Sequence, residues 1–159
     1  MEYLPNLSVV VLFQLIFFIV HAAVAKEKAN IFKYLSIGIL LGLPFGIAFD
    51  FIFGKSIGVF DYGAGFVLWF LFVNGFLSYG IMMANVLLLK HYSLLQVYLW
   101  SIALGFTYEV VNWKFPVWEW TFSSETIEYL VVIFAAYAGL TWLMMGWLRL
   151  VRGIKFKLF

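Results

Sequence analysis

Residues 34–53 read YLSIGILLGLPFGIAFDFIF, and Asp50 is the one charged side chain in this stretch. An α-helix needs about 20 predominantly apolar residues to cross the hydrocarbon core of a bilayer. The stretch is apolar on all sides, whereas a strand of a membrane barrel would alternate apolar and polar residues. Its backbone must therefore satisfy its own hydrogen bonds, and the sequence predicts a transmembrane helix here.

Four further stretches have the same character. They run from Leu7 to Ala25, from Phe66 to Leu89, from Leu94 to Trp113 and from Leu130 to Leu148. Across the chain 65% of residues are hydrophobic and 11% are charged, whereas about a quarter are charged in a soluble domain. We therefore predict an all-α integral membrane protein with five transmembrane helices, forming a single transmembrane domain over residues 1–159.

The composition also narrows the chemistry. The chain has no cysteine, two histidines and a net charge of +2. Without thiols there is no thiolate metal site and no catalytic cysteine, and so small a net charge argues against binding nucleic acid through a basic face. No motif in the sequence predicts a metal site or a cofactor. Membrane lipids are the partners that we expect.

Lysine and arginine are unevenly distributed over the loops between the predicted helices. If the N-terminus lies outside, the outer loops contain only Lys55 and Lys114. The inner segments then contain Lys26, Lys28, Lys33, Lys90, Arg149, Arg152, Lys155 and Lys157. Because cytoplasmic loops hold the excess of these residues, we expect an outside N-terminus and a cytoplasmic C-terminus. The membrane that we expect is the inner membrane of a prokaryotic cell. The basic tail, residues 149–159, would lie against anionic headgroups.

Two segments of the chain resemble each other. Residues 46–62 read GIAFDFIFGKSIGVFDY, and residues 105–120 read GFTYEVVNWKFPVWEW. With one single-residue gap, a glycine, an acid, a lysine and a valine-aromatic-acid-aromatic run recur in the same order. We interpret them as parts of two parallel helix-loop-helix repeats, over about residues 34–89 and 94–148, beside an N-terminal helix. Coincidence in a chain rich in phenylalanine and tryptophan is the alternative.

Asp50 and Glu109 occupy the same position in the two segments. Each precedes the outer end of its helix by three or four residues, which places both carboxylates about 5 Å below the same interface. Ionisable side chains inside a span are expensive and mark functional sites, so both are candidate catalytic residues, with a structural role as the alternative. A stripe of glycines at four-residue spacing precedes Asp50, formed by Gly38, Gly42 and Gly46. Such a stripe predicts a closely packed neighbouring helix and an aspartate that faces protein.

Other polar and aromatic side chains would complete a pocket in the outer half of the membrane. The candidate substrate-binding residues are Asn74, Asn112, Phe60, Asp61, Tyr62, Trp118, Glu119 and Trp120. For the two asparagines, and for Gln14 and Ser78, hydrogen bonding between helices is favoured over a role in chemistry.

Features of a known family occur between residues 36 and 85. They are an apolar helix ending in Phe49-Asp50, a short loop with Gly58-Val59-Phe60 followed by Tyr62, and a further helix. In these features the chain resembles the small membrane-embedded lycopene cyclase domain, and residues 108–120 look like a degenerate second copy. The resemblance implies a helical membrane fold and acid catalysis on an isoprenoid polyene.

The chain departs from that family at one position. The family has a proline and paired glutamates at the start of the following helix, where residues 73–76 of this chain read VNGF. The resemblance therefore implies that an acid-catalysed reaction would use Asp50 or Glu109 as the proton donor.

The sequence leaves three functions open. The first is the handling or modification of an isoprenoid, a carotenoid or another long apolar lipid in an outer-half pocket, with acid assistance if the protein is catalytic. The second is a non-catalytic subunit or scaffold, either homo-oligomeric or bound to another membrane protein. The third is a small transporter, which rests on the repeat and the paired acids.

Overall fold

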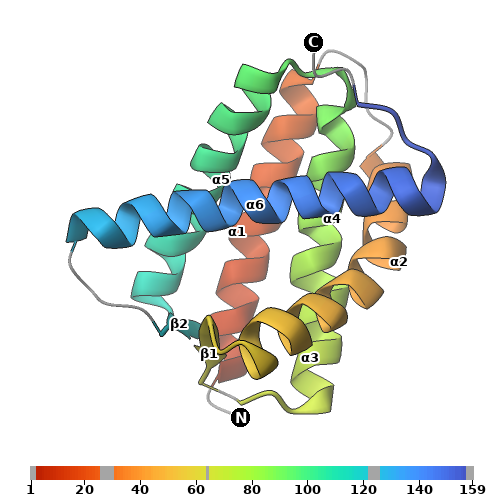
Figure 1. The fold of residues 1–159 in the computed structure, drawn as a ribbon. Coiled ribbons are helices and arrows are strands. Elements are labelled where there is room, and N and C mark those ends of the chain that lie inside the picture. Colours follow the sequence, from red (N-terminus) through yellow and green to blue (C-terminus); the bar gives the residue numbers. More distant parts are fainter. Residues whose placement is uncertain (1–2, 26–30, 64, 122–125, 157–159) are drawn as a thin grey trace.

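The computed structural model describes residues 3–25, 31–63, 65–121 and 126–156, which form helices, two short strands and the loops that connect them (Figure 1). The elements are α1 (Tyr3–Val24), α2 (Ile31–Phe49), the π-helix η1 (Asp50–Ser56), β1 (Phe60–Tyr62), α3 (Leu68–Asn74), the π-helix η2 (Gly75–Tyr79), α4 (Gly80–Leu88), the 3-10 helix η3 (Leu89–His91), α5 (Leu94–Lys114), β2 (Trp118–Trp120) and α6 (Thr126–Arg152). Five helical stretches are long and apolar enough to cross a membrane: Leu4–Val24, Ile31–Ser56, Leu68–His91, Leu94–Lys114 and Leu130–Arg152. The predicted multi-span helical membrane protein is confirmed at this level.

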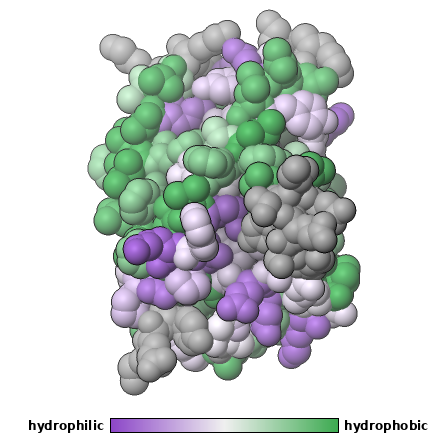
Figure 2. Space-filling model, turned by 90° about the vertical axis from the view of Figure 1, so that its left-hand side faces the viewer, coloured by the Kyte–Doolittle hydropathy of each residue, from purple (hydrophilic) through white to green (hydrophobic). Residues whose placement is uncertain are grey.

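The third span, formed by α3, η2 and α4, is the central element of the fold. Every residue of α4 is buried, and α4 contacts α1, α2 and α6. The outer helices instead expose large apolar side chains, and Trp113 is 89% exposed. On the face shown in Figure 2, hydrophobic side chains cover much of the upper half and hydrophilic ones gather below it. Apolar surface of this extent is typical of a protein that contacts lipid.

The glycine stripe of α2 packs against the central span. A Cβ atom on Gly42 would lie 2.5 Å from the backbone oxygen of Tyr79, and one on Gly38 would lie 2.5 Å from that of Gly80. A Cβ atom on Gly46 would lie 2.5 Å from Cδ2 of the Tyr79 ring. The stripe therefore brings the backbones of two helices into close contact, and the predicted role of these glycines is confirmed.

Helix α6 crosses the other helices instead of running beside α5 (Figure 1). Ser101 Oγ on α5 donates to Thr141 Oγ1 on α6 at 3.1 Å, and the Trp147 indole donates to the carbonyl oxygen of Leu41 on α2 at 3.2 Å. The interpretation of the chain as two parallel helix-loop-helix repeats stays a prediction. The sequence of α5 has Gly105 alone where α2 has a stripe, so α6 meets α5 over a short crossing. The orientation of the helices in a membrane stays a prediction.

Strands β1 and β2 form a two-stranded antiparallel sheet, which the sequence analysis does not predict. In its register Phe60 lies opposite Trp120, Asp61 opposite Glu119 and Tyr62 opposite Trp118. The sheet lies at the end of the molecule where α1 begins and α5 ends (Figure 1). It therefore joins the two aromatic segments that the sequence alignment equates.

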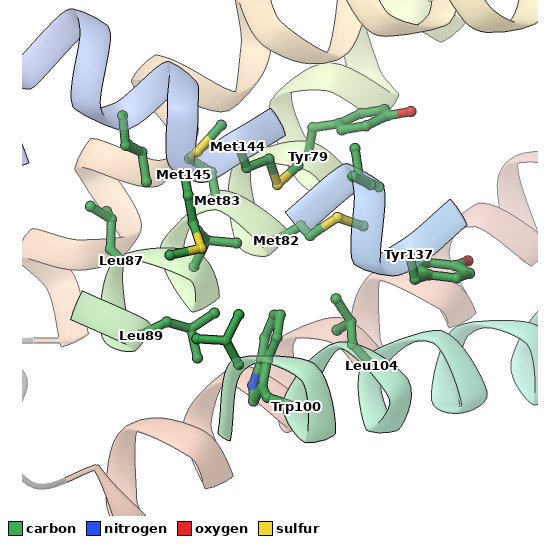
Figure 3. Packing of buried hydrophobic residues seen from close by; sticks show 14 of the residues in the cluster. Tyr79, Met82, Met83, Leu87, Leu89, Trp100, Leu104, Tyr137, Met144 and Met145 are labelled. Atoms are coloured by element: carbon green, nitrogen blue, oxygen red, sulfur yellow. The ribbon is translucent and has the colours of Figure 1, made fainter. Parts of the chain in front are cut away.

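Methionine side chains from two helices fill the core where α6 crosses α4. Figure 3 shows Met82 and Met83 of α4 and Met144 and Met145 of α6, with Trp100 and Leu104 of α5 nearby. The flexible methionine side chain suits the irregular gaps of such a crossing. Tyr79 and Tyr137 extend away from this cluster on the same side (Figure 3), and both line the cavity described next.

Candidate functional site

A cavity of about 300 Å³ lies between α1, α2, η2, α5, α6 and the two strands. This volume is at the lower end of the range for small-molecule sites, about 300–1,000 Å³. Its wall is mostly aromatic and aliphatic and includes Phe49, Phe53, Phe60, Tyr79, Trp118 and Trp120. On α6 the lining residues Gly139 and Leu143 are exposed, so the cavity opens beside this helix.

The carboxylate of Asp50 lies behind one wall of this cavity. Asp50 is 0% exposed, at the point where α2 passes into η1. Its Oδ1 accepts from the hydroxyls of Tyr79 at 2.6 Å and Tyr62 at 2.8 Å. Its Oδ2 accepts from Nδ2 of Asn74 at 3.3 Å. The prediction that Asp50 faces protein is confirmed. Asp50 begins the π-helix η1 and accepts a hydrogen bond from Tyr79 of the π-helix η2, and such segments often mark functional sites.

Tyr62 connects the sheet to this carboxylate. Its hydroxyl accepts a hydrogen bond from Nδ2 of Asn74 at 2.9 Å while donating to Asp50. Burial and, after it, the charge of Asp50 raise the pKa of Tyr62 well above its usual value. The phenol therefore remains a neutral hydrogen-bond donor at ordinary pH.

Glu109, like Asp50, accepts hydrogen bonds from residues that form the cavity wall. Its Oε1 accepts from the hydroxyl of Tyr137 at 3.0 Å, from Nε1 of Trp120 at 3.1 Å and from Nε1 of Trp118 at 3.4 Å. Glu109 is half-buried. One carboxylate thus orients both indoles of β2 and a tyrosine of α6.

The two acids make matching contacts. Each acid accepts a hydrogen bond from the last residue of the strand that follows it in the chain and from a tyrosine of the span after that strand. For Asp50 these donors are Tyr62 and Tyr79. For Glu109 they are Trp120 and Tyr137. The aligned glycines match as well, because a Cβ on Gly46 would lie 2.5 Å from the ring of Tyr79 and one on Gly105 would lie 2.8 Å from that of Tyr137. A duplicated unit would give such contacts, and the duplication itself stays a prediction.

The predicted site residues divide into two groups. Those that line the cavity are Asn74, Phe60, Tyr62, Trp118 and Trp120. Among the described residues, those outside its lining are Asp50, Glu109, Asn112, Asp61 and Glu119. The two acids reach the cavity only through the hydroxyl, amide and indole groups that bond to them.

The other non-lining residues shape the strands. Asn112 Oδ1 accepts from the backbone N–H groups of Val117 at 2.8 Å and Trp118 at 3.2 Å, and its Nδ2 donates to the Trp118 carbonyl at 2.8 Å. It therefore fixes the turn that leads into β2 and makes no bond to another helix among those described. Asp61 and Glu119 are exposed and face each other across the sheet.

Three lining residues carry polar atoms that the sequence analysis does not place here. Oε1 of Gln14, Oγ of Ser78 and the hydroxyl of Tyr108 are buried and have no hydrogen-bond partner among the described residues. The expectation of bonds between helices is therefore wrong for these atoms of Gln14 and Ser78. A polar residue within an apolar span was the available signal. That signal does not reveal which residues share one cavity.

The described ranges contain no group of three histidine, aspartate or glutamate side chains that would hold a metal ion. No protein-family model, curated protein or solved structure matches the chain. Function must therefore be inferred from the cavity and the groups around it.

Proposed function

We propose that this membrane protein holds one end of an isoprenoid, a carotenoid or a comparable long apolar lipid. The observation that supports this is the cavity of about 300 Å³, with its aromatic and aliphatic wall and its opening beside α6. The cavity lies at the lower end of the range for small-molecule sites and is open beside α6, so the proposal concerns one end group of a long lipid.

Acid-assisted modification is the catalytic form of the proposal, in line with the resemblance to the lycopene cyclase domain. Acid assistance would use Asp50 in its protonated form: its proton would pass to the hydroxyl of Tyr62 or Tyr79 as that hydroxyl gives its own proton to the lipid, and the carboxylate would remain. Both hydroxyls bond to Asp50 and both residues line the cavity. The Trp120 indole, oriented by Glu109, would offer its ring to a cationic intermediate.

Two glycines of α6 give a matched test of binding. A Cβ on Gly139 or on Gly146 would meet no atom within 4 Å, and Gly139 lines the cavity whereas Gly146 is not among its lining residues. Gly139→Leu therefore adds a side chain at the opening of the cavity, where it would obstruct a ligand, and Gly146→Leu adds the same side chain to the same helix away from the cavity lining. Each variant is expressed in cells that make isoprenoid lipids, purified, and analysed by mass spectrometry for co-purified lipid. We expect several-fold less isoprenoid lipid with Gly139→Leu than with Gly146→Leu, and equal amounts would contradict the proposal.

The catalytic form has its own test. Asp50→Asn and Glu109→Gln keep the size of the side chains, and the isoprenoid lipids of cells expressing each variant are compared with those of cells expressing the unaltered chain. A changed ratio of precursor to product supports acid assistance. An unchanged profile with normally folded protein removes it and leaves the binding proposal in place.

The scaffold and the transporter stay predictions, and no contact in the described residues favours either. The glycine stripe that the scaffold would use for docking a partner packs against the chain's own central span at Gly80 and Ala84. The paired acids on which the transporter rests are held by the donors of the cavity wall.

A further inference from the structure

Three buried polar groups on different elements line the same cavity and have no hydrogen-bond partner in the described part of the chain. Gln14 on α1 is 2% exposed, Ser78 on η2 is 6% exposed and Tyr108 on α5 is 3% exposed. The unpartnered atoms are Oε1 of Gln14, Oγ of Ser78 and the Tyr108 hydroxyl. Buried polar groups are nearly always hydrogen-bonded, and each exception calls for an explanation such as a bound molecule.

The lack of partners is unusual for each group. A serine inside a helix commonly bonds back to the carbonyl four residues earlier, as Ser101 does to Val97 at 2.8 Å. Ser78 lies in the π-helical segment η2, and its Oγ has no such bond. The nearest tyrosine, Tyr137, donates to Glu109 and stacks edge-on against Tyr108 at 5.7 Å between ring centres. Tyr108 thus has an aromatic neighbour and no acceptor within the described part of the chain.

The chemistry of these groups selects a class of ligand. The two hydroxyls can donate or accept a hydrogen bond, and the amide oxygen of Gln14 accepts one. No lysine, arginine or histidine is among the described residues that line the cavity. An anionic headgroup would therefore be buried without a counter-charge, at a large cost in free energy. A permanently cationic headgroup would make no direct ion pair with Asp50 or Glu109, because neither acid is among the residues that line the cavity.

We propose that the lipid end group in the cavity carries an uncharged hydroxyl, which donates to Oε1 of Gln14 and accepts from the hydroxyls of Ser78 and Tyr108. This inference rests on the proposed function and narrows its substrate class from long apolar lipids to isoprenoid alcohols. The aromatic part of the wall then surrounds the hydrocarbon next to the oxygen. Water molecules alone in the same places are the competing explanation.

The test uses three probes with one carbon skeleton: retinol, retinoic acid and the corresponding hydrocarbon without oxygen. Each is titrated into the purified full-length protein in lipid nanodiscs. Binding is followed by energy transfer from tryptophan to the polyene, since Trp118 and Trp120 line the cavity. We expect retinol to bind at least tenfold more tightly than either of the other probes. Gly139→Leu should abolish the saturable signal, and Gly146→Leu should preserve it.

Variants then assign the preference to the named atoms. Ser78→Ala and Tyr108→Phe remove hydroxyls that have no hydrogen-bond partner among the described residues, so both variants should fold. Each should weaken retinol binding by about fivefold or more and leave binding of the hydrocarbon unchanged. Tyr98→Phe is the matched control, because Tyr98 lies on the same helix, is 42% exposed and is not among the lining residues.

The outcomes separate this inference from the proposed function. Saturable binding that Gly139→Leu abolishes, but with equal affinity for retinol and the hydrocarbon, overturns the inference and leaves the proposed function standing. The same holds if Ser78→Ala and Tyr108→Phe bind retinol as tightly as Tyr98→Phe does, because water would then fill those positions. Tighter binding of retinoic acid also overturns it. No saturable binding of any probe overturns both.

Discussion

Replacing Gly42 by alanine should separate α2 from the central span. A Cβ at this position would lie 2.5 Å from the carbonyl oxygen of Tyr79 and 2.6 Å from the nitrogen and Cα of Gly80. All three are backbone atoms, so no side-chain rotation relieves the overlap. The helices must move apart, and Tyr79 must move relative to Asp50, whose carboxylate accepts its hydroxyl at 2.6 Å.

The size of the effect follows from two opposing contributions. The closest contact must lengthen by about 0.9 Å to reach ordinary van der Waals distance, and overpacking of this kind typically costs about 1–3 kcal/mol. An alanine in place of a helical glycine returns up to about 1 kcal/mol of helix stability. The net expectation for Gly42→Ala is a loss of about 1–2 kcal/mol in the free energy of unfolding.

Gly146→Ala is the matched control, because a Cβ there would meet no atom within 4 Å. The detergent-solubilised variants are heated in steps, and the monodisperse fraction is measured by size-exclusion chromatography with tryptophan fluorescence. The midpoint temperature should fall for Gly42→Ala and should stay equal or rise for Gly146→Ala. Equal midpoints for the two variants would refute the close backbone packing of α2 on the central span.

Two further predictions concern acidic residues of the cavity wall and of the sheet. Tyr79→Phe should lower the thermal midpoint more than Tyr137→Phe, because it removes the shortest hydrogen bond to the fully buried Asp50. A lost bond to a charged group costs about 1.5–3 kcal/mol, and equal losses for the two variants would contradict this difference. Glu119→Lys should stabilise the protein by about 0.2–1 kcal/mol at low salt, because it replaces the repulsion with Asp61 directly across the sheet by attraction. The same substitution combined with Asp61→Asn should give little gain, and a full gain there would contradict the register.

The helices were predictable and the way in which they cross was not. Long apolar stretches identify spans by length and composition alone, and the glycine stripe identifies a close contact between helices. The path of α6 depends on which side chains meet at Gly105, Thr141 and Trp147, and periodicity carries no information about that. The sheet could not be predicted from the sequence either, because a three-residue strand is too short to show an alternating pattern and its partner lies far away in the sequence.

Only part of the candidate site was predictable, because the sequence shows which residues are unusual in a span and does not show which residues meet. Asp50 and Glu109 stand out in the sequence because charges are rare in spans. Their donors Tyr79 and Tyr137 do not stand out, since tyrosine is common in this chain. Placing the acids behind the cavity wall required knowing which face of each helix its neighbours cover. The two acids that position the cavity wall are therefore visible in the sequence, whereas most of the residues that form the wall are not.

The position of the acids makes physical sense for a cavity that receives an apolar end group. A carboxylate exposed directly to such a cavity would lack water and a counter-charge, whereas Asp50 is satisfied by two hydroxyls and an amide that themselves form the wall. Asp50 thus affects the shape and polarity of the cavity by fixing the positions of Tyr62, Tyr79 and Asn74. Asp50→Asn keeps an oxygen for Tyr79 and Tyr62, and Asp50→Ala keeps none. If the acid only positions the wall, Asp50→Asn should retain lipid binding that Asp50→Ala loses. If it also donates a proton, both variants should lose turnover.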